Sequence, residues 1–161
     1  MTPTKDHISS AFDRDLEGIQ ARIMKMGGLV EQAILDAAQA LETRDQELAE
    51  QVRANDRVID ELEELLNEEA ARVIALRAPT AIDLRVILSV MRMSANLERI
   101  GDLAKNLAKR NAVLMSMPAI NGSAAQLRRM SRDVQIMLKD ALDAYIQRDD
   151  ALARDVIERD V

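Results

Sequence analysis

The stretch Ala40-Leu-Glu-Thr-Arg-Asp-Gln-Glu-Leu-Ala-Glu-Gln-Val52 recurs as Ala144-Tyr-Ile-Gln-Arg-Asp-Asp-Ala-Leu-Ala-Arg-Asp-Val156, 104 residues further along the chain. The register extends upstream, because Asp36-Ala37 falls on Asp140-Ala141. The Arg-Asp pair inside each copy is typical of a tight turn that ends with the N-cap of a second helix. Two helices and their turn in one frame predict a tandem repeat of a three-helix unit.

The composition favours an all-α fold. Apolar residues make up 48% of the chain, yet it has one Tyr, one Phe and no Trp, so aliphatic side chains and Met must fill the core. Only 5 Gly and 3 Pro are present, too few turn signals for a many-stranded sheet protein. We therefore expect antiparallel helical bundles, in which 161 residues complete one core and begin a second.

Three long helices are expected before residue 117. The first runs from near Asp6 to Glu42, and Gly27 and Gly28 within it predict a bend or a close helix contact. Its heptad seam consists of Phe12, Leu16, Ile19, Ile23, Met26, Val30, Ala33, Ala37 and Ala40.

The second helix begins after Asp45, and Asn55 and Glu69 occupy two positions of its otherwise mostly apolar seam. Thr80 and Asp83 have the spacing of a capping box that opens the third helix. A narrow seam on that helix permits close packing and consists of Val90, Ser94, Leu97, Gly101, Ala104 and Ala108.

The break at residues 117–123 divides the chain into a first three-helix repeat, 1–116, and the start of a second, 123–161. Asp160 corresponds to Asp56, so the second copy stops early, and we expect a longer protein with another acidic helix at about position 202. We also expect self-association, as a homodimer, or disorder of the second repeat. The side chains expected to be exposed are Val134, Met137, Leu138, Leu142 and Leu152.

Charge and targeting signals exclude several classes of protein. The net charge of −6 opposes nucleic-acid binding, and the absence of Cys excludes disulfides and thiolate chemistry. No window is apolar enough to span a membrane, so we expect a cytoplasmic protein that meets the membrane only through partners.

Two pairs of carboxylates share one position on neighbouring helices. Asp56 and Asp60 each follow a seam residue of the second helix, and Glu98 and Asp102 do the same on the third. Four such groups could converge on a hard cation. The alternative is a set of ordinary surface ion pairs, because Lys105 and other basic residues stand three positions away from three of these carboxylates.

Catalysis is not expected, and we assign no catalytic or cofactor-binding residue. A di-metal carboxylate enzyme needs Glu-x-x-His on two helices, whereas the chain has only His7, and no nucleophile–base pair can be assembled. A purely structural coiled coil is the other alternative. Polar and small residues at seam positions, such as Ser94 and Gly101, suit a short bundle better than a rod.

The segment Asn96-Leu-Glu-Arg-Ile-Gly-Asp-Leu-Ala-Lys-Asn106 resembles the repeated helix motif of the PhoU family. Met24–Glu31 and Arg77–Arg85 are similar to the family segments in the first and third helices. The resemblance implies a negative regulator of phosphate uptake and phosphate-starvation signalling. Its implied partners are the ATPase of the phosphate ABC transporter and a membrane sensor histidine kinase, between which it acts as an adaptor.

The same resemblance implies metal binding, because acidic-x-x-x-Asp motifs of the family can hold metal clusters. The matching positions here are Asp56, Asp60, Glu98 and Asp102. The implied metal is a divalent or ferric ion, with iron, manganese, zinc and magnesium as candidates.

Overall fold

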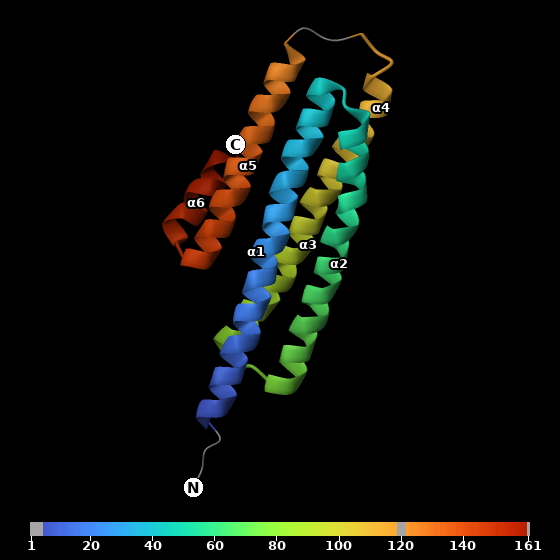
Figure 1. Cartoon of the computed structure of the whole chain (residues 1–161). Coiled ribbons are helices and arrows are strands. Elements are labelled where there is room, and N and C mark those ends of the chain that lie inside the picture. The colour runs from blue at the N-terminus through green and yellow to red at the C-terminus, as the bar shows by residue number, and fades with distance from the viewer. Residues whose placement is uncertain (1–4, 119–121, 161) are drawn as a thin grey trace.

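The computed structural model describes residues 5–118 and 122–160, with side chains from residue 11 onward, so the side chain of His7 lies outside it. Every regular element in these ranges is a helix, which confirms the all-α prediction (Figure 1). The helices are α1 (Lys5–Thr43), α2 (Gln46–Arg77), α3 (Ala81–Lys109), the short α4 (Asn111–Leu114), α5 (Ser123–Gln147) and α6 (Asp150–Arg159).

Helices α1, α2 and α3 form a long bundle with one apolar core (Figure 1). The predicted seam of α3 is confirmed, since all six of its residues are buried. The seam of α1 is buried over most of its length, and Phe12 and Ala33 pack at its edge. The largest fully buried side chains are Ile19, Ile23, Met26, Leu66 and Ile87.

The predicted seam of α2 is wrong at two polar positions. Asn55 is exposed and Glu69 is only half-buried, and the buried residues are their neighbours Asp56 and Ala70. Either Asn55 or Asp56, and either Glu69 or Ala70, could continue the buried stripe, because successive buried residues on a helix are three or four positions apart. A buried carboxylate is tolerated here because Lys105 pairs with Asp56 from α3.

The turns of the two repeats have the same geometry. Arg44 and Arg148 both adopt the left-handed conformation, with φ of 56° and 54°. The Asp45 carboxylate accepts a hydrogen bond from the Leu48 amide at 3.0 Å, as the next helix begins. At the other turn Asp149 accepts from Leu152, also at 3.0 Å.

The expected capping box at the start of α3 is not formed. Thr80 occupies the N-cap position, but its side chain makes no capping hydrogen bond. The Asp83 amide instead donates to the Thr80 backbone carbonyl at 3.0 Å. The main chain thus satisfies this donor without the hydroxyl.

Helix α5 packs along α1, and this contact corrects the predicted exposure of Leu138 and Leu142, whereas Val134 is exposed as predicted (Figure 1). Leu138 and Leu142 were expected to be exposed and are buried against the first bundle. A Cβ added at Gly27 would overlap Leu142 Cδ1, so the predicted close helix contact at this glycine is confirmed. Whether residues 1–116 and 123–161 form separate domains stays a prediction.

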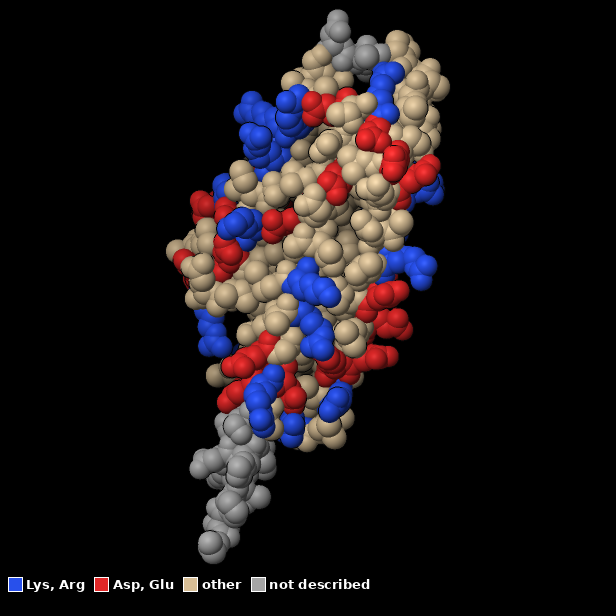
Figure 2. Space-filling view, in the orientation of Figure 1, with Lys and Arg blue, Asp and Glu red and all other residues tan. Residues whose placement is uncertain are grey.

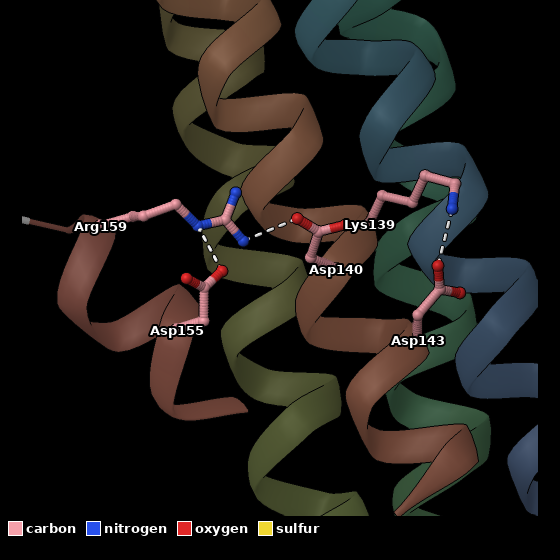
Figure 3. A network of polar contacts seen from close by, with 5 residues as sticks. All are labelled: Lys139, Asp140, Asp143, Asp155 and Arg159. Atoms are coloured by element: carbon pink, nitrogen blue, oxygen red, sulfur yellow. Dashed lines mark hydrogen bonds and ion pairs between the residues drawn. The ribbon is translucent and has the colours of Figure 1, made fainter. Parts of the chain in front are cut away.

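Ion pairs join α6 to α5 (Figure 3). The Arg159 guanidinium of α6 contacts Asp140 of α5 at 2.6 Å and Asp155 of its own helix at 3.0 Å. Lys139 and Asp143 form a further pair along α5 at 2.6 Å. In the ranges that the structure describes, no helix is long and apolar enough to cross a membrane.

Candidate functional site

The candidate site lies where α2 faces α3, and Gly101 makes the close approach possible. A Cβ at this position would lie 3.1 Å from Ile59 Cδ1 and 3.6 Å from Asp56 Oδ1. The glycine therefore leaves room for a core isoleucine and for an acidic side chain that is only 5% exposed. The side chain of Asp56 reaches the interior because Gly101, which faces it from α3, has no side chain.

Lys105 bridges the two helices electrostatically. Its ammonium group contacts Asp56 Oδ2 across the interface and Asp102 Oδ1 on its own helix, the latter at 2.5 Å. The hydrogen bond to Asp102, followed by that to Asp56, raises the pKa of Lys105, so the amine remains charged. Asp56 Oδ1 is buried and has no hydrogen-bond partner among the described residues.

Asp60 and Glu98 complete the group of four carboxylates and are more exposed to solvent than Asp56. Burial raises the pKa of Asp60, and the negative charge of Asp56 raises it further. Burial also raises the pKa of Glu98, with Asp102 and then Asp60 adding to the effect. Each carboxyl thus feels acidic groups of the other helix, and all four predicted residues are brought into one neighbourhood.

The donor set has the right chemistry for a hard cation, because carboxylate oxygens are its preferred ligands. The Lys105 ammonium stands in for such a cation between Asp56 and Asp102. As the side chains lie, however, no three His, Asp or Glu residues in the described ranges are arranged to hold a metal ion. Metal binding would require Lys105 to turn away, and it remains a prediction.

The ion-pair alternative is realised only in part. Lys105 does pair with Asp102, three positions before it. Arg57, in contrast, pairs with Glu61 at 3.8 Å rather than with Asp60. Sequence reasoning missed the second contact of Lys105, with Asp56, and the available signal was its position one turn after Gly101 on the packed face of α3.

Comparison with protein families gives a match to the PhoU domain over residues 23–110 and 127–161. A phosphate-specific transport system accessory protein PhoU homolog of Rhizobium meliloti is 40% identical over 154 residues, covering 96% of this chain and 65% of the relative. The Escherichia coli PhoU accessory protein is 37% identical over 143 residues, covering 89% and 59%. The chain thus spans about two thirds or less of the length of these relatives.

Solved structures agree with this match. The crystal structure of PhoU from Pseudomonas aeruginosa matches with a TM-score of 0.88 and 38% identity, over 92% of this chain and 71% of that one. The PhoU regulatory protein of Streptococcus pneumoniae matches with a TM-score of 0.85 and 29% identity, over 92% and 70%. By sequence and by fold, this chain belongs to the PhoU family.

Proposed function

We propose that this protein is a negative regulator of phosphate uptake and phosphate-starvation signalling that works through protein contact. Its partners would be the ATPase of the phosphate ABC transporter and a sensor histidine kinase, between which it acts as an adaptor. The observation that carries the proposal is the match across 96% of the chain to an accessory protein of the phosphate-specific transport system.

A deletion strain tests this function. Removing the gene should switch on phosphate-starvation genes while phosphate is plentiful, which a phosphatase reporter measures. Restoring the intact gene should return the reporter to its repressed level. Normal repression in the deletion strain would contradict the proposal.

We further propose that Asp60, Glu98 and Asp102, with Asp56 behind them, hold a hard divalent or ferric cation. The support is that burial, and then the negative charge of neighbouring carboxylates, raises the pKa of Asp60 and of Glu98, and a bound cation would offset both effects. Such an ion would supply positive charge that ties α2 to α3.

Metal analysis with a matched control tests the cation site. Protein purified without chelators and supplied with iron, manganese, zinc or magnesium should carry a stoichiometric ion. The change Glu98→Ala with Asp102→Ala should remove that ion. Glu64→Ala with Glu68→Ala, at the same spacing on the exposed side of α2, should leave it bound. A wild type that binds none of these metals, or an ion that survives the first pair of changes, would show that the assignment is wrong.

A further inference from the structure

A small groove lies between the N-terminal half of α1 and the last turns of α2, and its volume is about 190 Å³. The charged residues that line it are Arg14, Asp15 and Arg22 from α1 and Glu69 and Arg72 from α2. Figure 2 shows basic and acidic side chains interleaved over the lower part of the molecule, where these two helix ends lie in Figure 1. Two helices thus bring three guanidinium groups to one small hollow.

The guanidinium group of Arg22 is held in place inside this groove. Its Nη1 atom contacts Glu69 Oε2 across the helix interface at 3.0 Å and donates to the Gly18 carbonyl at 3.3 Å. Both contacts use Nη1, and a guanidinium group has five N–H donors, so Nε and Nη2 remain to bind a ligand. Because the two contacts already fix the side chain, little conformational entropy is lost when a ligand binds.

Positive charge exceeds negative charge around the groove. Each carboxylate of the lining has a cationic partner, because Arg77 pairs with Asp15 at 3.0 Å and Arg22 pairs with Glu69. Arg72 is exposed and forms no ion pair within the described residues. With the remaining arginine of the lining, four guanidinium groups stand against two carboxylates, which leaves an excess of two positive charges. That excess matches the charge of a dianion.

The Glu69 carboxylate lacks a hydrogen-bond donor. Its Oε2 atom is buried and accepts no hydrogen bond among the described residues, so its contact with Arg22 is an ion pair only. A buried acceptor without a donor costs free energy, which a suitable ligand recovers. A ligand that carries both negative charge and a hydroxyl would satisfy the guanidinium groups and this carboxylate together.

We propose that this groove binds one free inorganic phosphate dianion. The guanidinium groups of Arg22 and Arg72 donate to its oxygens, and its hydroxyl donates to the Glu69 carboxylate. The groove is smaller than the roughly 300 Å³ at which pockets for drug-sized ligands begin, so it suits a small anion rather than a nucleotide or a peptide. Sulfate has the same shape and charge but no hydroxyl, so the carboxylate discriminates against it.

The same chemistry separates free phosphate from a phosphoryl group on a larger molecule. A phosphate ester such as phosphoserine is a dianion at mildly alkaline pH, and the ester bond has replaced its last hydroxyl. Such a group therefore has no proton to donate to Glu69. It should bind as weakly as sulfate, although its charge is the same as that of free phosphate.

Calorimetric titration of the full chain with inorganic phosphate tests the site, at mildly alkaline pH and with a chelator present to exclude metal ions. The titration should show saturable binding at one site. Arg72→Gln should weaken binding by about tenfold, as expected for the loss of a charge-assisted hydrogen bond. Arg53→Gln, at an exposed position of α2 outside the groove, is the matched control and should leave binding unchanged. Circular dichroism should show the same helicity for both variants, because both side chains are exposed.

Sulfate and phosphoserine test the role of Glu69. Both should bind about tenfold more weakly than phosphate, and Glu69→Gln should narrow this difference, because its amide can donate to either anion. Absence of saturable phosphate binding would overturn the proposal, as would an equal loss of binding in the Arg72→Gln and Arg53→Gln variants. Sulfate or phosphoserine that binds as tightly as phosphate would also overturn it, because the hydroxyl would then not be recognised. The titration measures binding alone, so its failure is distinguishable from a failure of the proposed regulation.

Discussion

The buried carboxylate of Asp56 on α2 contacts the ammonium group of Lys105 on α3. The acid is 5% exposed and the lysine 32% exposed, so the pair spans the boundary between core and solvent. Removing one partner of a buried pair leaves an uncompensated charge, whereas removing both does not. The pair therefore holds α2 and α3 in register, and the contributions of Asp56 and Lys105 to stability are coupled.

A double-mutant cycle measures this dependence. Lys105→Met should lower the free energy of unfolding by about 2 kcal/mol, less than for a fully buried pair because the lysine is partly in water. Asp56→Leu with Lys105→Met should cost less than the two single changes together. Urea denaturation gives the values. Single effects that add to within about 0.5 kcal/mol would show that the two residues are not coupled.

An added methyl group at Gly101 would crowd the core. Gly101→Ala should destabilise the protein by about 1–2 kcal/mol, because the new methyl group meets Ile59 Cδ1 in a packed core, and better helix propensity offsets only part of this. Ile59→Val removes that Cδ1 atom and should cost less in the Gly101→Ala background than in the wild type. Gly28→Ala is the control, because nothing lies within 4 Å of its added Cβ, and it should stabilise the protein slightly.

The Asp56–Lys105 pair and Gly101 depend on contacts between helices that are distant in the sequence. Hydrophobic periodicity and turn signals predict the helices and the repeat, because local spacing carries that information. The choice between Asn55 and Asp56 as the buried residue depends on Lys105, 49 residues away, and no local pattern on α2 contains it. The burial of Leu138 and Leu142 likewise depends on α1, to which α5 is not adjacent in sequence.

The raised pKa of Asp60 predicts a pH-dependent gain from removing its charge. A carboxyl whose pKa is higher in the folded state opposes folding above its ordinary value, and this penalty fades as the pH falls through the folded-state pKa. Asp60→Asn should therefore stabilise the protein at pH 7, by about 0.3 kcal/mol as for a like-charge helix pair.

The difference in stability between Asp60→Asn and the wild type should shrink towards pH 4. Thermal unfolding across a pH series measures this difference. Glu64→Gln, exposed on the same helix, controls for the loss of one negative charge and should show a smaller gain at pH 7. A gain from Asp60→Asn that stays constant down to pH 4, or a loss at neutral pH, would contradict the crowding of carboxylates between α2 and α3.

Crosslinking in living cells tests the proposed regulation of phosphate signalling by contact with other proteins. The intact gene product, tagged at its chromosomal position and crosslinked during growth in high phosphate, should be recovered with the transporter ATPase and the sensor histidine kinase. A folded, tagged protein that still represses the phosphate-starvation reporter but is recovered with neither partner would contradict the claim.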